Sequence, residues 1–197
     1  MAPHHHDGHP QFDPHRLHAM EERRSAEMAP EDILRTVATE DLTSLADIGC
    51  GSGYFTIAAA RMLPQTRILA VDRQQDMLDF VAERARSAGL TNVETIQSDA
   101  TSLPFADAEL DAVLMSHVFH DIPEHAAMRE EVHRVLKPGG AFFLVEWEKE
   151  DTPMGPPLAI RIGSDDLSAI LRAGGFKVEQ VLHGPGSTYR LLARRPN

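Results

Sequence analysis

Short apolar runs alternate with amphipathic helical patterns from Ser44 onward, and this alternation constrains the fold more than any other feature of the chain. Apolar runs of strand length that are separated by helical segments are typical of βαβ units, which build a mostly parallel sheet. We therefore predict an α/β fold with a doubly wound sheet. The predicted strands are Ser44–Ile48, Arg67–Val71, Val93–Gln97, Leu110–Ser116, Ala141–Trp147, Phe176–Leu182 and Thr188–Ala193.

Helical spacing and turn residues mark the segments between these strands. One helix is predicted from an apolar face that ends before Gly89, because glycine commonly follows a helix end. That face consists of Met77, Leu78, Val81, Ala82, Ala85 and Ala88. A second helix is expected to be capped by Asp121, to carry Pro123 in its first turn and to end at LKPGG, Leu136–Gly140. A third is predicted over Ser164–Ala173. The turn HGPG, His183–Gly186, predicts that the last two strands form an antiparallel hairpin at the sheet edge.

The N-terminal region differs in composition from the rest of the chain. Six of the 11 histidines lie within the first 18 residues, in a segment that prolines interrupt. We expect residues 1–14 to form a flexible tail, either simply solvated or able to bind Ni, Cu or Zn weakly. Helical patterns at Arg16–Glu27 and Pro30–Thr39 predict an N-terminal helical cap over residues 15–41. Residues 42–197 would then form the α/β domain.

Three glycines follow the first predicted strand in the stretch LADIGCGSGYF, Leu45–Phe55. Gly49, Gly51 and Gly53 permit a tight turn and leave no Cβ atoms in the way of a ligand that approaches the backbone. The spacing is G-x-G-x-G, whereas a dinucleotide loop is spaced G-x-G-x-x-G, so the match to a pyrophosphate site is incomplete. A glycine-rich turn without any ligand is the alternative interpretation.

Acidic residues follow the next two predicted strands. Asp72 lies 19 positions after Gly53, where a carboxylate can accept hydrogen bonds from both ribose hydroxyls of an adenosine. In SDATSLPF, Asp99 can accept from an exocyclic amine, Ala100 offers a backbone N–H and Leu103 offers an apolar wall. The pattern favours a nucleotide or a nucleoside-containing cofactor. A surface Asp72 that only caps the following helix is the alternative.

The fourth predicted strand leads into a histidine-bearing loop, LDAVLMSHVFHDI, Leu110–Ile122. His117, His120 and Asp121 would lie at the carboxyl end of the sheet, where open α/β folds bind ligands. Glu146 and Trp147 end the fifth strand on that same side. Trp147 could wall an apolar pocket and Glu146 could hydrogen-bond a ligand. Alternatively, Trp147 could lie at the edge of the core and Glu146 could simply be solvated.

These motifs together resemble a class I S-adenosylmethionine-dependent methyltransferase, from Ser44 to about Trp147. LADIGCGSG is similar to the glycine-rich first motif of this family, AVD to its ribose acid, SDATSLPF to its adenine region and LDAVLMSHVFHDI to its fourth-strand motif. REEVHRVLKPGGAFFLVEW, Arg129–Trp147, resembles the helix, turn and fifth strand of small-molecule members. The resemblance is to the group that includes quinone-biosynthesis C-methyltransferases and arsenite methyltransferases, and it implies a Rossmann-like seven-stranded sheet.

The resemblance also implies roles for individual residues. The methionine end of the cofactor would lie near Asp47 and the glycine loop, and the carbonyl of Ser116 would hold its amino group. The full set of implied cofactor residues is Asp47, Gly49, Cys50, Gly51, Gly53, Asp72, Arg73, Asp99, Ala100 and Ser116. The substrate residues would be Tyr54, His117, His120, Glu146 and Trp147. The bound molecules would be S-adenosylmethionine and its product S-adenosylhomocysteine.

Differences between this sequence and the family's motifs narrow the range of possible substrates. Arsenite methylation needs several thiols, and Cys50 is the only cysteine, so we exclude that activity. The Asn-Pro-Pro-aromatic motif of many base N-methyltransferases is replaced by SHVFH. A net charge of −11 also argues against a broad surface for nucleic acid. We expect a small-molecule acceptor, no membrane span and a reducing, cytoplasmic setting. The oligomeric state stays open.

Methyl transfer from a sulfonium needs an acceptor held in line and shielded from water, without a covalent nucleophile. If the acceptor is a hydroxyl or an acidic carbon, His117 or His120 could act as a catalytic base, although positioning or structural roles are equally open. No metal is expected, because Asp121 is the only nearby residue that could act as a third ligand beside His117 and His120. The competing hypotheses are an NAD-dependent oxidoreductase, a non-catalytic cofactor-binding module and a methyltransferase for RNA or protein.

Overall fold

The computed structural model describes residues 11–21, 29–36 and 41–197. The strands are β1 (Ser44–Ile48), β2 (Arg67–Asp72), β3 (Val93–Gln97), β4 (Leu110–Ser116), β5 (Leu136–Trp147), β6 (Lys177–His183) and β7 (Thr188–Arg194). The α-helices in the described residues are α1 (Pro14–Ala19), α3 (Pro30–Leu34), α4 (Tyr54–Met62), α5 (Gln75–Ser87), α6 (His125–Val135) and α7 (Ser164–Ala173). Short 3-10 turns are η1 (Phe119–Asp121), η2 (Leu158–Ile160) and η3 (Pro185–Ser187).

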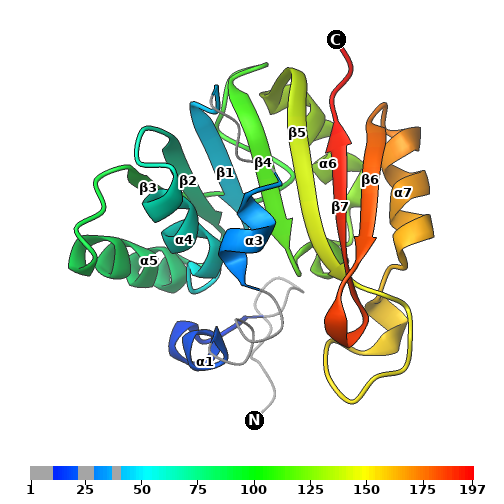
Figure 1. The fold of residues 1–197 in the computed structure, drawn as a ribbon, viewed down its shortest axis with the longest axis horizontal. Helices are drawn as coiled ribbons and strands as arrows, with labels where there is room; N and C mark the ends of the chain where they lie inside the picture. Colours follow the sequence, from blue (N-terminus) through cyan, green and yellow to red (C-terminus); the bar gives the residue numbers. More distant parts are fainter. Residues whose placement is uncertain (1–10, 22–28, 37–40) are drawn as a thin grey trace. The chain divides into compact units, whose positions relative to one another are not determined.

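The seven strands follow the order β3-β2-β1-β4-β5-β7-β6 (Figure 1), which confirms the predicted seven-stranded α/β fold. The chain divides into two compact units, one that ends at Asp99 and one that begins at Ala100. Each unit is described by itself below.

The first unit contains three parallel strands, β1 to β3. All five residues of β1 are buried, as are the last five of β2, and such continuous apolar burial is typical of parallel strands that helices cover on both faces. Helix α4 is buried along most of its length, whereas α5 buries only one face. That face carries four of the predicted residues, Met77, Leu78, Val81 and Ala85. Gly89, at φ 68°, follows the end of α5 as predicted.

The second unit combines a parallel pair with an antiparallel edge. Strands β4 and β5 are parallel, whereas β7 pairs antiparallel with both β5 and β6. Figure 1 shows α7 beside the edge strand β6, and the β6–β7 turn at the same end of the unit as the loop that follows β5. The predicted edge hairpin is therefore confirmed, with β7 on its inner side.

One predicted helix start and one predicted strand start are wrong, whereas α6 ends at Val135, directly before LKPGG, as predicted. Glu124, rather than Asp121, is the N-cap of α6, and Asp121 belongs to η1. The Pro-Gly-Gly stretch that was expected to form a turn lies inside β5. The amide of Gly139 donates to the carbonyl of Arg195, and the amide of Arg195 donates to the carbonyl of Gly140, so pairing with the C-terminal strand region keeps this stretch extended.

The N-terminal predictions are only partly covered by the described residues. Helix α1 begins at Pro14, inside the segment expected to be a tail, because Asp13 caps it by accepting from the amides of His15 and Arg16. Helix α3 begins at Pro30 as predicted and is described to Leu34. The remainder of both predicted helices and most of the predicted tail lie outside the described residues, and the domain boundaries at residues 14 and 41 stay predictions.

Candidate active site

The glycine-rich loop joins β1 to α4 in the first unit. Gly49, Gly51 and Gly53 have φ values of 69°, 53° and 82°, a region of backbone conformation that favours glycine. A Cβ atom on Gly53 would also lie 2.9 Å from a methyl group of Val81, so α5 packs tightly against the loop. The amides of Gly49 and Cys50 both donate to the carbonyl of Val71, at 2.8 and 3.1 Å. The loop is thus tied to the end of β2.

Asp72, the predicted ribose acid, lies where the loop meets the end of β2. Its Oδ2 accepts from the amide of Gly51 at 3.0 Å, and its Oδ1 accepts from the amide of Gln74 at 2.9 Å. Burial raises the pKa of this carboxyl, although backbone hydrogen bonds from Gln74, Gly51 and Arg73 and the charge of Arg73 oppose the shift. A carboxylate has about four lone-pair sites, so Asp72 retains the capacity to accept from a ribose hydroxyl as well.

Asp47 is a second buried carboxyl in the same unit, with only 3% of the residue exposed. Thr56 donates to its Oδ2 at 2.6 Å. Burial raises its pKa to about 6, and the nearby charge of Asp72 adds to the shift. Burial likewise raises the pKa of the neighbouring Cys50 thiol, so this side chain stays protonated and is a poor nucleophile.

The second unit brings together two of the predicted residues, His120 from η1 and Glu146 from β5. The Nδ1 of His120 lies 2.8 Å from the Oε2 of Glu146, and the two side chains are 5% and 2% exposed. Asp121 lies on the other side of the ring, 3.6 Å from Nε2. Burial lowers the pKa of His120, but the hydrogen bond and the charge of Glu146 outweigh that effect and raise it overall. His120 is therefore a stronger base than free imidazole.

His117 and Trp147 form a second contact in this unit. Their ring centroids are 5.3 Å apart. His117 has a φ of 57°, an uncommon value for a residue with a side chain, and its amide donates to the carbonyl of Val145 at 2.8 Å. Strained residues of this kind cluster at functional sites. The hydroxyl of Ser116, just before the turn, is buried and has no hydrogen-bond partner among the residues that the structure describes.

An arginine that the sequence did not single out organises the loop after β5. Arg161 is 4% exposed and donates to the carbonyls of Glu150, Met154 and Pro156. Its guanidinium also lies over the Trp147 ring, 5.4 Å from the centroid. This arginine therefore holds the loop after β5 against the predicted substrate residue Trp147. No local pattern marks Arg161 in the sequence, because all of these partners are backbone atoms or distant side chains.

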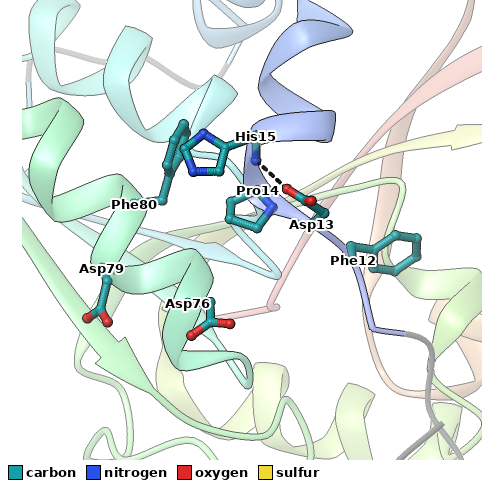
Figure 2. Close-up of a pocket in the computed structure, with 7 residues that line it drawn as sticks. All are labelled: Phe12, Asp13, Pro14, His15, Asp76, Asp79 and Phe80. Atoms are coloured by element: carbon teal, nitrogen blue, oxygen red, sulfur yellow. Dashed lines mark hydrogen bonds between the residues drawn. The ribbon is translucent and has the colours of Figure 1, made fainter. Parts of the chain in front are cut away.

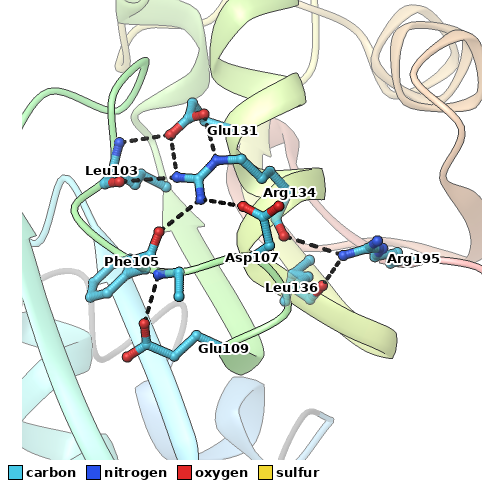
Figure 3. Close-up of polar contacts among 9 residues, drawn as sticks. Leu103, Phe105, Asp107, Glu109, Glu131, Arg134, Leu136 and Arg195 are labelled. Atoms are coloured by element: carbon cyan, nitrogen blue, oxygen red, sulfur yellow. Dashed lines mark hydrogen bonds and ion pairs between the residues drawn. The ribbon is translucent and has the colours of Figure 1, made fainter.

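A second arginine holds the segment that contains the predicted adenine wall. Arg134 of α6 donates to the carbonyls of Leu103 and Phe105, and it pairs with Asp107 and Glu131 (Figure 3). Glu131 in turn accepts from the amide of Leu103 at 2.9 Å, and its hydrogen bond with Arg134 lowers its pKa. The network fixes the loop that follows β3 and leaves Leu103 buried.

The remaining predicted residues are placed as follows. Tyr54 is buried at the start of α4 and contacts Phe55 edge to face. Arg73 follows β2, and its carbonyl accepts from the side chain of Gln97. Asp99 is exposed and Ala100 is half-buried. Among the described residues, no group of three or more His, Cys, Asp and Glu is arranged to hold a metal ion. None of the described helices has the length and apolar character needed to cross a bilayer.

The order of the strands, the family match and the similarity to solved structures define the class of this protein, which is a class I S-adenosylmethionine-dependent methyltransferase. The family model described as "Methyltransferase domain" matches residues 46–144. The chain belongs to this methyltransferase domain family, and membership implies S-adenosylmethionine as the cofactor.

Individual relatives agree with this assignment. A demethylmenaquinone methyltransferase of Geobacillus stearothermophilus is 30% identical over 117 residues, which cover 59% of this chain and 50% of the relative. The chain thus spans about half the length of the curated relatives it matches. A SAM-dependent methyltransferase from Aquifex aeolicus superposes with a TM-score of 0.86 at 26% identity, covering 94% of this chain and all of that one. The [4+2]-cyclase SpnF, at 22% identity and a TM-score of 0.76 over 98% of this chain and 88% of its own, shares the fold alone.

Proposed function

We propose that this methyltransferase acts on a small organic acceptor that must lose a proton, and that His120 takes this proton with Glu146 behind it. The observation that carries the proposal is the buried contact of 2.8 Å between the Nδ1 of His120 and Glu146. A carboxylate at Nδ1 holds the imidazole in the tautomer whose Nε2 carries the free lone pair. The acceptor's proton would move to Nε2, and Glu146 would stabilise the imidazolium that forms.

The electrostatics of the pair suit this role. A general base works best when its pKa lies near the working pH, and Glu146 moves the pKa of His120 upward from its ordinary value of about 6.5. Because Glu146 is only 2% exposed, little water competes for its interaction with the ring. The rings of His117 and Trp147 contact each other in the same unit, and we propose that they wall an apolar, ring-bearing acceptor.

We further propose that the first unit holds the cofactor through Asp72, the loop Gly49–Gly53 and Asp47. When bound, S-adenosylmethionine supplies a methyl group that is already activated. Asp72 fits the ribose because its carboxylate keeps lone pair capacity beyond its backbone hydrogen bonds, and glycine allows the positive φ angles of the loop. Asp47 offers a buried negative charge in the same unit. The roles predicted for Cys50, Arg73, Asp99, Ala100 and Ser116 stay predictions.

The names of the curated relatives suggest the first acceptor to test. They are demethylmenaquinone methyltransferases, and a reduced demethylmenaquinone has ring hydroxyls whose loss of a proton to a histidine base would make the ring carbon nucleophilic. We therefore propose a quinol-like or phenolic acceptor for this chain. The net charge of −11 supports a small molecule rather than a nucleic acid.

The test has two stages. Calorimetric titration with S-adenosylmethionine, S-adenosylhomocysteine and NAD, on the wild type and Asp72→Ala, is expected to show binding of the first two that the variant loses. Formation of S-adenosylhomocysteine is then measured with a short-chain demethylmenaquinol and simple phenols. Binding of NAD alone would contradict the cofactor assignment.

Histidine variants test the base. We expect His120→Gln to lower kcat at least about 100-fold, a typical contribution of a general base. Glu146→Gln should lower the apparent pKa of the rising limb of the rate–pH profile, because Glu146 raises the pKa of His120. His183→Gln is the matched control, since its side chain is 67% exposed and contacts only Glu148 among the described ion pairs. A rate for His120→Gln within twofold of the wild type would refute the role of His120.

A further inference from the structure

Two charged side chains contact Ser52, the residue between the last two glycines of the cofactor loop. The hydroxyl of Ser52 donates to the Oε1 of Glu21 at 2.9 Å, and the Nη1 of Arg84 donates to the carbonyl of Ser52 at 2.6 Å. Arg84 also forms a two-pronged ion pair with Glu21, at 2.6 and 2.9 Å. We call Glu21, Ser52 and Arg84 the loop clamp.

The loop clamp is largely shielded from water. The side chains of Glu21 and Arg84 are 11% and 21% exposed. A charged pair at this depth is stable only while both partners and their hydrogen bonds are present, because removal of one leaves a buried charge unpaired. The Ser52 carbonyl belongs to the peptide that leads into Gly53, so Arg84 fixes the orientation of the loop immediately before α4 begins.

The same clamp attaches the N-terminal segment, residues 11–21, to the loop. At one end of the segment, Glu21 belongs to the clamp. In the middle of the segment, a methyl group of Leu17 lies 3.3 Å from the position that a Cβ atom on Gly51 would take. At the other end, the backbone of Phe12 exchanges two hydrogen bonds of 3.0 Å with the side chain of Gln74, two residues after the ribose acid Asp72. The segment therefore spans the loop and is held at both ends.

Further contacts dock this segment on α5. The ring of His15 meets Phe80 edge to face, with centroids 4.9 Å apart, and the ring of His18 lies 5.6 Å from the same side chain. Figure 2 shows the ring of His15 next to that of Phe80, with Asp13 and Phe12 following toward the chain start. The Nδ1 of His18 is also 2.9 Å from Glu21. Helix α1 is thus aligned by the same carboxylate that binds Arg84.

We propose that Glu21 and Arg84 are positioning residues that couple the docked N-terminal segment to the cofactor loop, so that docking and cofactor binding strengthen each other. This inference rests on the proposed binding of the cofactor at that loop. With the clamp formed, the loop already has the shape that the cofactor needs. The free energy of cofactor binding is then not reduced by the cost of ordering the loop. Coupling of this kind is reciprocal, so the cofactor must stabilise the docked segment by the same factor.

The experiment measures both directions of the coupling with S-adenosylhomocysteine as the probe. The variants are Glu21→Gln, Arg84→Met and Arg84→Lys. Arg86→Met is the matched control, because Arg86 lies on the same helix, is 71% exposed and pairs only with Glu83 among the described ion pairs. We expect Kd to rise about fivefold or more in the Glu21→Gln and Arg84→Met variants, within the usual range of coupling, and to stay within twofold in the control. Arg84→Lys should restore only part of the affinity, since lysine lacks the planar fork.

Hydrogen exchange of the α1 amides supplies the reciprocal readout. In the wild type, S-adenosylhomocysteine should slow exchange at Leu17 and Met20, and Glu21→Gln should largely abolish this protection. If Arg84→Met does not fold, the isosteric Glu21→Gln variant carries the test.

The outcomes separate the two proposals. Failure of the wild type to bind S-adenosylhomocysteine would refute the proposed cofactor site itself. Normal binding by the wild type together with unchanged Kd in the clamp variants would overturn only the coupling. A raised Kd without any ligand effect on α1 exchange in the wild type would also overturn it, because the clamp would then support the loop without involving the N-terminal segment.

Discussion

Asp47→Asn should stabilise this protein at neutral pH, because the charged form of Asp47 is disfavoured in the folded chain. Burial raises the pKa of this carboxyl from an ordinary value of 3.8 to about 6. A pKa difference of one between the folded and unfolded states corresponds to about 1.36 kcal/mol, so ionised Asp47 costs the folded state about 3 kcal/mol above pH 6. Asparagine keeps an oxygen that can accept from Thr56, whose hydroxyl lies 2.6 Å from Asp47 in the wild type.

The sign of the pH dependence follows from proton binding. Between the ordinary value and about pH 6, the folded state binds more protons at Asp47 than the unfolded state does. Stability therefore falls as pH rises through this window, and the loss persists at higher pH. The variant should match the wild type near pH 4 and exceed it by up to about 3 kcal/mol at pH 8, which is about 6–12 °C in Tm for a chain of this size.

The assay is thermal unfolding followed by far-UV circular dichroism at pH 4.5 and pH 8. Subtracting the unfolding free energy of the wild type from that of the variant at each pH cancels the contributions of all other titrating groups. Asp151→Asn serves as the control, because this residue is exposed. Equal stability of Asp47→Asn and wild type at pH 8, or a difference that does not change with pH, would refute the argument. Buried carboxylates that lower the stability of the fold in this way are typical of sites where the charge serves to bind a ligand.

Three other perturbations test the second unit. Glu146→Gln should destabilise by about 3 kcal/mol at pH 5.5, the usual cost of breaking a buried ion pair, and by less at pH 9 in urea titrations, because the raised pKa of His120 stabilises the fold only while the ring is protonated. An equal loss at both pH values would contradict this. Gly155→Ala should cost about 2 kcal/mol, because φ is 99° and the new Cβ would lie 3.0 Å from Trp147. Since Trp147 is the only tryptophan, its emission should shift as well, and an unchanged spectrum and Tm would exclude the clash. Arg134→Met should speed hydrogen exchange in the loop that Arg134 holds by at least about fivefold, given a loss of about 1 kcal/mol or more, and unaltered exchange would show that the network is not needed there.

The strands were predictable because their pattern is local and strong. Strands β1, β3 and β4 have the predicted limits, and the limits of β2, β6 and β7 differ by one residue at one or both ends. The largest error, at Leu136–Gly140, arose because Pro-Gly-Gly is typical of a turn. In the folded chain this stretch hydrogen-bonds to Arg195, near the end of the sequence, and such pairing overrides local preference.

The candidate site was predictable where function depends on residues adjacent in sequence. The glycine loop and Asp72 follow directly from their spacing, and Glu146 and His120 were each identified as candidates at strand ends. Their pairing was not predicted, because 26 residues separate them and only the parallel arrangement of β4 and β5 brings them within 2.8 Å. Arg84, Arg134 and Arg161 were missed, because each binds backbone carbonyls that carry no side-chain signal.

By itself, the sequence determined the class of fold, the place of the glycine loop and the family to which the chain belongs. These depend on periodicity and on short motifs, which the order of residues encodes directly. Only the tertiary structure decided which charges are paired. The energy of a buried charge depends on its depth and on partners from distant elements, as the His120–Glu146 pair and the loop clamp both show.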